Sequence, residues 1–234
     1  MNHQPIEKAV TSQDGSLEIH SIFHTIQGEG PFCGTPAIFI RLAGCNLKCP
    51  ACDTDYTSNR VKLTVSQILS KCNEFSKEGL IVITGGEPFR QQIGQIVGIL
   101  VSYGYYVQIE TNGTLPPSPQ IMWSKKFWER KGAYIVCSPK AGKINSVLEK
   151  EACCFKYVLS YDSVAEDGLP IKVLDHSCHP FVARAAFKGR PVYVQPADSK
   201  CNELNNRNNR VAIESAMQNG YILQLQVHKL LDLE

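Results

Sequence analysis

The stretch RLAGCNLKCPACDTDYT, residues 41 to 57, holds three of the chain's ten cysteines directly behind a strand-like apolar run. Cys45, Cys49 and Cys52 are spaced C-x3-C-x2-C. Structural zinc sites and ferredoxin-type clusters normally take four protein ligands. Three thiolates leave one iron of a four-iron cluster open, so the spacing indicates an iron–sulfur site with a free position. A zinc knuckle, or three buried thiols, is the alternative.

The composition is that of a globular chain. Its 234 residues are 43% hydrophobic and 20% charged, with a formal net charge of +2. This near-neutral charge gives no reason to expect nucleic acid as a partner. Met1–Gly15 lacks an apolar signal core, and the longest apolar stretch, Ile93–Val107, is too interrupted to span a membrane. We therefore expect a single domain over residues 1–234, no membrane contact, and a cytoplasmic location in which thiols stay reduced.

Short strand-like runs alternate with helical patterns along the chain. Strands are predicted at Ala37–Ala43, Leu80–Thr84, Tyr105–Glu110, Ala133–Cys137, Phe155–Ser160, Val192–Gln195 and Tyr221–Val227. Helices are predicted from Thr64 to about Asn73, from Phe89 to Tyr103 and from about Asn205 to Asn219. The alternation predicts parallel βαβ units, while several connections are too short for a helix. The pattern favours an α/β fold, a partial TIM-like barrel of parallel strands with fewer helices than strands.

The unusual loops each follow a predicted strand directly. They read AGCNLKC, TGGEP, ETNG, CSPK, QPAD and QVHK. In α/β barrels the carboxyl ends of parallel strands meet at one face, so these loops are predicted to form one site. The alternative is that Gly and Pro only form ordinary turns in these loops. That would explain any one loop, but it poorly explains all six.

The triad spacing, led by CNLKC and followed one strand later by GGEP, resembles the signature of the radical S-adenosylmethionine enzymes. The resemblance implies a radical SAM core with one [4Fe-4S] cluster on Cys45, Cys49 and Cys52, in a cluster loop of residues 45–54. S-adenosylmethionine would bind the open iron and contact Ala51, Cys52, Asp53, Gly86, Ser138, Pro139 and Lys140. A solvated surface charge is the alternative for Lys140. The other seven cysteines show no ligand spacing and are predicted to be ordinary thiols.

A longer stretch, FHTIQGEGPFCGTPAIFIRLAGCNLKC at residues 23 to 49, is more specific. With CDT, TGGEP, ETNG, SPK, QP and the terminal QVHK, it resembles the 7-carboxy-7-deazaguanine synthase family from Phe23 onward. This implies a carbon–nitrogen lyase of deazapurine and queuosine biosynthesis. A 5′-deoxyadenosyl radical would take a hydrogen from 6-carboxy-5,6,7,8-tetrahydropterin, whose ring then contracts with loss of ammonia. Ile222 and Val227 depart from the family, whose members often have arginine and threonine there.

The resemblance also implies the residues that contact the pterin. They are Ile26, Gln27, Gly28, Arg41, Thr84 and Glu234, with Glu29, Glu110, Gln195 and His228 as further candidates. Apart from the resemblance, Arg41 is a charged residue within an otherwise apolar strand. Its planar guanidinium can bind a carboxylate through two parallel hydrogen bonds. A buried salt bridge to Glu29 or Glu110 is the alternative. Thr54 resembles the family's Mg²⁺ ligand, and substrate and water would have to supply further oxygens.

The apolar tail, residues 230–234, is predicted to fold back over the cavity and bring the terminal carboxylate near the substrate. Capping the barrel or contacting a second subunit is the alternative for its leucines. The resemblance further implies a homodimer and an electron donor such as flavodoxin or ferredoxin. No chemistry is predicted for residues 160–190.

Two rival functions share part of the pattern. A glycyl-radical activating enzyme would use the same triad and cofactor, but it acts on a polypeptide and gains nothing obvious from Gln27, Arg41 or Thr54. A non-catalytic iron–sulfur or zinc-binding protein would need neither GGEP nor SPK.

Overall fold

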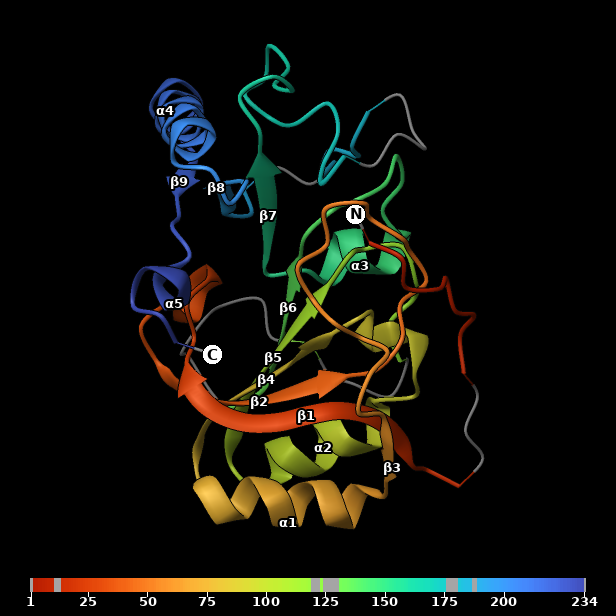
Figure 1. Cartoon of the computed structure of the whole chain (residues 1–234). Coiled ribbons are helices and arrows are strands. Elements are labelled where there is room, and N and C mark those ends of the chain that lie inside the picture. Colours follow the sequence, from red (N-terminus) through yellow and green to blue (C-terminus); the bar gives the residue numbers. More distant parts are fainter. Residues whose placement is uncertain are drawn as a thin grey trace.

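The computed structural model of the chain describes residues 2–10, 14–118, 123, 131–175, 181–186 and 189–233. Within them, nine strands form one curved sheet (Figure 1). The strands are β1 (Leu17–Ile26), β2 (Pro36–Leu42), β3 (Val61–Leu63), β4 (Gly79–Gly85), β5 (Tyr105–Thr111), β6 (Ala133–Cys137), β7 (Cys154–Leu159), β8 (Val192–Pro196) and β9 (Ile222–Leu223). Their order is β3-β1-β2-β4-β5-β6-β7-β8-β9. Neighbours from β2 to β9 pair in parallel, and β1 and β3 extend one edge in antiparallel pairing.

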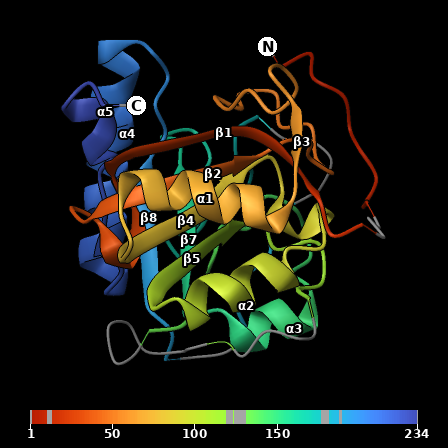
Figure 2. The ribbon, with the colours of Figure 1, turned by 90° about the horizontal axis from the view of Figure 1, so that it is seen from below.

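The helices lie on the outer face of this sheet and at its far edge (Figure 2). They are α1 (Val65–Phe75), α2 (Gly94–Ser102), α3 (Ser146–Glu151), α4 (Asn202–Asn219) and α5 (Val227–Leu230), with 3₁₀ turns at Gly30–Phe32 and Pro88–Arg90. The described chain thus has fewer helices than strands, as predicted for a partial barrel. No helix in these residues is both long enough and apolar enough to cross a membrane.

Alternation along the strands separates two apolar clusters. Residues facing out, such as Ile40, Ile83 and Ile109, pack against the helices. Residues facing in near the amino ends of the strands form a smaller plug of Phe32, Ala37, Leu80, Val82, Tyr134, Val136, Cys153 and Cys154. Because side chains alternate with a period of two, the inner positions further along each strand lie above this plug. Those positions are polar, and they line the candidate site.

Several predicted boundaries hold because local signals set them. Thr64 and Gln67 form the capping box that starts α1. Gly220, with φ of +69°, ends α4 in the left-handed conformation.

Three predictions of elements were incomplete or wrong. The helix predicted over Phe89–Tyr103 is split, because the Gln91 side chain bonds both backbone groups of Glu18, at 2.7 and 2.9 Å. The strand predicted over Tyr221–Val227 is limited to β9, after which the chain turns into α5. β1 was missed, because its alternation is broken by a register shift between Ile19 and Ser21.

Candidate active site

Five of the six predicted site loops converge as expected, whereas QVHK does not follow a strand directly and begins α5. AGCNLKC, GEP, NG, SPK and AD follow the carboxyl ends of β2, β4, β5, β6 and β8. Since these strands are parallel, the loops share one end of the sheet.

The cluster loop places three thiols in the turn after β2. Cys49 is 8% exposed, and Cys45 and Cys52 are partly buried. Burial raises the pKa of Cys45 to about 12 and also raises that of Cys52, so both stay protonated without a metal. Among the described residues, no three His, Cys, Asp or Glu side chains are close enough for a single metal ion. The Leu47 amide donates to the Cys45 sulfur at 3.4 Å, a contact that would also stabilise a cluster-bound thiolate.

The glycines of GGEP allow two backbones to pack directly. The Gly86 amide donates to the Leu42 carbonyl at 3.1 Å, and the Glu87 amide donates to the Gly44 carbonyl at 3.0 Å. A Cβ on Gly86 would lie 1.9 Å from the Gly44 carbonyl oxygen, and Gly85 has φ of +113°. A side chain at Gly86 would therefore push this loop off the start of the cluster loop, and one at Gly85 would clash with the Leu42 backbone in β2.

Glu87 joins the GGEP and ETNG loops inside the protein. It is fully buried, and it accepts hydrogen bonds from the Asn112 amide at 2.8 Å and the Thr111 hydroxyl at 2.7 Å. These hydrogen bonds lower the pKa of Glu87, but burial outweighs them and raises it to about 7. The Asn112 side chain donates to Asn46 in the cluster loop at 2.9 Å, and Asn46 donates to Thr114 at 2.8 Å. The ETNG loop thus acts as a brace between the two loops before it.

The SPK loop is more enclosed than a surface turn. Ser138 and Pro139 are buried, and the partly buried Lys140 ammonium lies 2.5 Å from the Ser138 hydroxyl. Burial lowers the pKa of Lys140, and the Lys156 charge lowers it further. The solvated-charge alternative for Lys140 is therefore wrong.

Two carboxylates organise the inner face above the apolar plug, and Glu110 is the first. It accepts hydrogen bonds from Gln27 at 3.1 Å, Gln108 at 2.8 Å and the Thr84 hydroxyl at 3.3 Å. Three residues that the sequence proposed for the substrate, Gln27, Thr84 and Glu110, are thus in direct contact.

Glu29 is the second carboxylate. The Lys156 ammonium pairs with it, and Gln226 and Gln195 donate to it at 2.7 and 3.3 Å. Burial would raise the pKa of Glu29, but Lys156 outweighs burial and lowers it to about 2. The carboxylate is therefore ionised across the physiological range.

The inner face also holds two amide oxygens without donors. Oε1 of Gln108 and Oε1 of Gln195 are buried and have no hydrogen-bond partner among the described residues, while their amide nitrogens face the two carboxylates. Leaving a buried acceptor unsatisfied costs about 1–3 kcal/mol. A ligand that offers N–H donors to this face would recover that cost.

Arg41 lies on the same inner face, paired in register with Thr84. Its guanidinium stands 5.0 Å from the centre of the Phe23 ring and forms no ion pair with Glu29 or Glu110. The salt-bridge alternative is therefore wrong.

The C-terminal segment closes one side of the site. The Val227 amide donates to the Gly28 carbonyl at 3.2 Å, and a Cβ on Gly28 would lie 2.1 Å from Nδ1 of His228. Lys229 bonds Asp53 of the cluster loop at 2.8 Å and Asp198 at 3.2 Å. α5 therefore connects the cluster loop to the QGEG segment.

The remaining predicted residues are more peripheral. Ile26 ends β1, Ala51 is exposed, and Thr54 is partly buried on the cluster loop. Leu230 and Leu231 are 69% and 61% exposed, so the prediction that the tail covers the cavity is wrong for these residues. Glu234 lies outside the described residues.

Sequence reasoning missed three members of the inner face: Gln108, Lys156 and Gln226. Lys156 carries the signal that identified Arg41, a charge inside an apolar strand (CFKYVL), and is buried with 7% of its surface exposed. Gln226 gave no signal, because it was assigned to the end of a predicted strand that the structure ends at Leu223.

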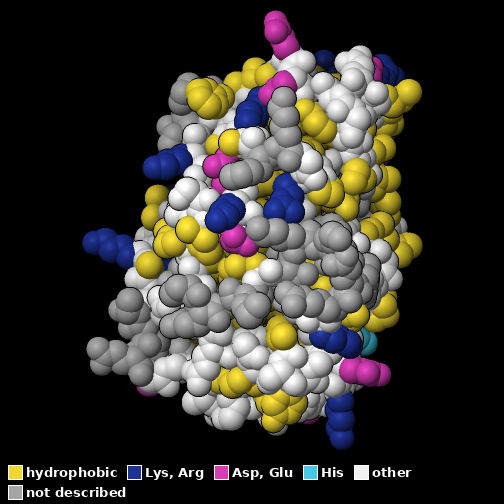
Figure 3. All heavy atoms as spheres, turned by 180° about the vertical axis from the view of Figure 1, so that it is seen from behind, with side chains coloured by type: hydrophobic (Ala, Val, Ile, Leu, Met, Phe, Trp, Pro, Cys, Tyr) yellow, Lys and Arg dark blue, Asp and Glu magenta, His cyan; other side chains and the backbone are white. Residues whose placement is uncertain are grey.

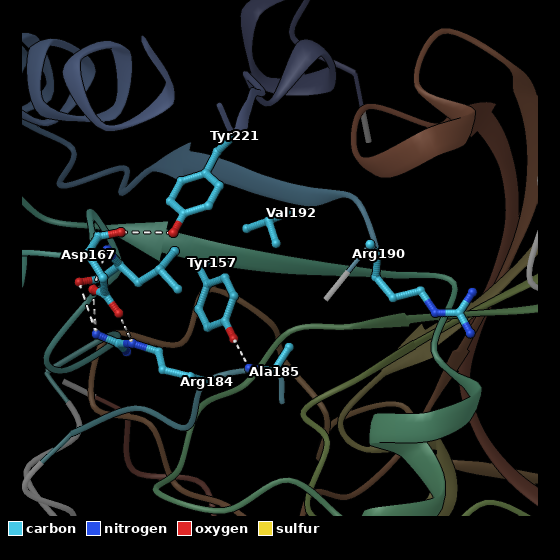
Figure 4. A pocket seen from close by; sticks show the side chains of 9 residues that line it. Tyr157, Asp167, Arg184, Ala185, Arg190, Val192 and Tyr221 are labelled. Carbon is cyan, nitrogen blue, oxygen red and sulfur yellow. Dashed lines mark hydrogen bonds and ion pairs between the residues drawn. The ribbon is translucent and has the colours of Figure 1, made fainter. Parts of the chain in front are cut away.

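A separate hollow of about 340 Å³ lies at β7 and β8, lined by residues that include Tyr157, Asp167, Arg184 and Tyr221 (Figure 4). Arg184 forms a bidentate pair with Asp167, at 2.6 and 3.0 Å. The Tyr221 hydroxyl donates to the Asp167 carbonyl at 2.8 Å. Because these groups satisfy one another, we assign no ligand to the hollow.

A mostly parallel partial barrel, with a three-cysteine loop after β2 and a glycine-rich loop packed on it, defines the radical SAM class of enzymes. No family model matches the chain. It is 40% identical to the 7-carboxy-7-deazaguanine synthase of Rickettsia prowazekii, over 99% of this chain and 95% of that protein. It is 39% identical to the synthase of Rhodospirillum rubrum, over 92% of each chain. The chain belongs to the 7-carboxy-7-deazaguanine synthase family.

The fold has a solved counterpart. The crystal structure of QueE from Escherichia coli superposes with a TM-score of 0.64 at 22% identity, over 90% of this chain and 94% of that one. At this identity the match supports the fold, and the chemistry has to be argued from the residues.

Proposed function

We propose that this enzyme converts 6-carboxy-5,6,7,8-tetrahydropterin to 7-carboxy-7-deazaguanine by radical ring contraction with loss of ammonia, in deazapurine and queuosine biosynthesis. The observation that carries the proposal is the polar inner face beside the cluster loop. Glu29, Glu110 and the two unpaired amide oxygens are acceptors, and Arg41 is a cation that forms no ion pair with the described residues. A carboxylated pterin offers the complement, since it has ring N–H and amino donors and one carboxylate.

The cofactors follow from the family and the thiols. Cys45, Cys49 and Cys52 would hold one [4Fe-4S] cluster, and Asp53, Gly86 and the SPK loop would bind S-adenosylmethionine. When bound and reduced, this pair supplies the 5′-deoxyadenosyl radical that abstracts hydrogen. The chain's own task is to orient the pterin. Arg41 would hold the carboxylate, while the two glutamates and the amides would hold the nitrogen-rich edge.

Mg²⁺ is proposed beside Thr54. A single hydroxyl is a poor site for a hard cation, so the substrate carboxylate and water must complete the oxygen shell. The partly buried position of Thr54, two residues after Cys52, is compatible with such a shared site.

A homodimer is proposed through the edge formed by α4, β9 and α5. Large apolar side chains are exposed there, namely Ile213, Met217, Ile222, Leu223, Leu225, Leu230, Leu231 and Leu233. Hydrophobic side chains gather along this edge of the molecule, on the right in Figure 3. Apolar surface of this extent on an open sheet edge is typical of a covered interface. An electron donor such as flavodoxin or ferredoxin and a cytoplasmic location are proposed from the need for a reduced cluster.

Iron analysis and spectroscopy test the cofactor chemistry. After anaerobic reconstitution we expect about four irons per chain, and an electron paramagnetic resonance signal that changes when S-adenosylmethionine is added. A protein that takes up zinc in place of iron, or whose signal ignores S-adenosylmethionine, would be a binding protein instead.

A further inference from the structure

The segment that precedes β1 crosses the cluster loop and bonds to its backbone. We call residues 2–10 the N-terminal strap. The Asn2 amide donates to the Pro50 carbonyl at 2.8 Å, and its side-chain amide donates to the Cys49 carbonyl at 3.1 Å. The Glu7 amide donates to the Cys45 carbonyl at 2.8 Å. The strap therefore satisfies backbone acceptors of two of the three thiol-bearing residues.

Gln4 binds the other end of the loop with both atoms of its amide. Its Nε2 donates to the Thr54 carbonyl at 2.9 Å, and its Oε1 accepts from the Tyr56 amide at 2.7 Å. The Thr57 hydroxyl donates to the same oxygen at 3.2 Å. The Gln4 side chain thus pairs with the backbone groups of Thr54 and Tyr56, as a neighbouring strand would, at the end of the cluster loop.

Ion pairs hold the strap in place. Glu7 pairs with Arg60 at 2.6 Å and with Arg90 at 3.2 Å, and the hydrogen bond from Arg60 contributes most to lowering the pKa of Glu7. Arg90 is 2% exposed, and its carbonyl accepts from the Val10 amide at 2.7 Å. His3 points into solvent between these contacts.

We propose that the N-terminal strap is a positioning element that holds the cluster loop in its ligand-ready shape before the cluster is loaded and keeps the cluster bound afterwards. Only two backbone–backbone hydrogen bonds lie within the described loop: Gly44 to Tyr56 at 2.7 Å closes it, and Cys52 to Cys49 at 3.1 Å makes one turn. A loop with so few internal contacts opens easily unless a second segment orders it. The proposal rests on the proposed function only in assigning a cluster to this loop.

Hydrogen exchange of the metal-free chain tests the strap without any turnover. In Gln4→Ala, and more so in Asn2→Ala/Gln4→Ala, we expect amides 45–57 to exchange about two- to tenfold faster for each hydrogen bond lost. His3→Ala is the matched control, since its side chain lies on the same strap and is exposed. After reconstitution, the two strap variants should also lose iron to a chelator several-fold faster than the control.

The proposal is overturned if exchange of the loop and loss of iron are the same in both strap variants as in His3→Ala. The readouts separate this idea from the assigned reaction. If the strap variants exchange faster and lose iron faster but the wild-type enzyme does not turn over the pterin, the strap proposal stands and the proposed substrate is wrong. If the pterin is turned over normally and the strap variants match the control, the proposed substrate stands and the strap proposal is wrong.

Discussion

At the residue scale, the inner face contains charged side chains on largely apolar strands. Burying such a charge is costly unless a partner of opposite charge compensates it. Lys156 and Glu29 are 8% and 12% exposed in their side chains, and each is stable there only because of the other. Arg41 has no such ion pair with any described residue, and we propose that the ligand accounts for its place. These two cations therefore differ in role, and their variants should differ in what they lose.

We expect Lys156→Met to lower the free energy of unfolding of the metal-free protein by about 3–5 kcal/mol at pH 7, because it leaves a buried charge unpaired. The lowered pKa of Glu29 contributes wild-type stability that is present above its ordinary value of 4.5 and is lost as the pH falls toward about 2. In the variant, burial raises that pKa, so acid relieves the unpaired charge. The deficit should therefore shrink from pH 7 to pH 5 in denaturant titrations. Lys156→Met/Glu29→Gln should recover most of it, and an equal deficit at both pH values would contradict the prediction.

Arg41→Lys should weaken substrate binding and spare the cofactor. An ammonium cannot reproduce a bidentate fork, and losing one charge-assisted hydrogen bond costs about 1.5–3 kcal/mol, or about 10- to 150-fold in KM for the pterin. The dissociation constant for S-adenosylmethionine should stay at the wild-type value. Arg210→Lys, on the exposed surface of α4, is the control. A loss of cofactor binding would mean that Arg41 does not face the substrate.

At the element scale, backbone contacts fix the positions of the loops, and only some of these contacts can be predicted from the sequence. Gly86 was predicted to contact a ligand, and the structure adds a second requirement for glycine there, because Gly86 packs on the backbone of Gly44. The final strand was predicted from YILQLQV, whose alternation is clear. The structure keeps only β9, because β8 pairs with two of its residues and the chain then leaves for Gly28. The short pairing of β9 with β8 competes with the distant Val227–Gly28 contact, and the local alternation of apolar residues does not predict which of them prevails.

Lys229 ties α5 to two carboxylates, and Lys229→Met should loosen α5 without unfolding the protein. Its partners Asp53 and Asp198 are 54% and 30% exposed in their side chains, and such pairs are worth about 0–1 kcal/mol. We expect amide exchange in residues 227–231 to rise about two- to fivefold, with an unchanged unfolding midpoint. Lys77→Met on the exposed surface is the control. If α5 exchanges at the wild-type rate in the variant, other contacts hold it.

At the scale of the whole molecule, the parallel order of the strands could be predicted, and with it the convergence of the loops at one end. The antiparallel strands β1 and β3 could not, since a bulge hides the pattern of β1 and β3 has three residues. The polar network was also beyond sequence reasoning, because Gln226 meets Glu29 from 197 residues away. Curvature of the sheet brings such pairs together, and no spacing along the chain encodes it.

The apolar edge of α4, β9 and α5 should mediate a dimer. Met217 and Leu230 are 81% and 69% exposed there, so Met217→Glu/Leu230→Glu should shift the protein to a monomer in sedimentation velocity at micromolar concentration. Tyr103→Glu, at a 59% exposed position elsewhere, should leave the dimer intact. A wild-type monomer, or a double variant that remains dimeric, would contradict this assignment.

The central claim is that the three-cysteine loop and the polar inner face act together on a carboxylated pterin. Its most direct test is product formation per chain, measured by mass spectrometry after anaerobic incubation with 6-carboxytetrahydropterin, S-adenosylmethionine, Mg²⁺ and a reductant. We expect many equivalents of 7-carboxy-7-deazaguanine from the wild-type protein and none from Cys49→Ala. Cleavage of S-adenosylmethionine to 5′-deoxyadenosine without any deazaguanine product would contradict it.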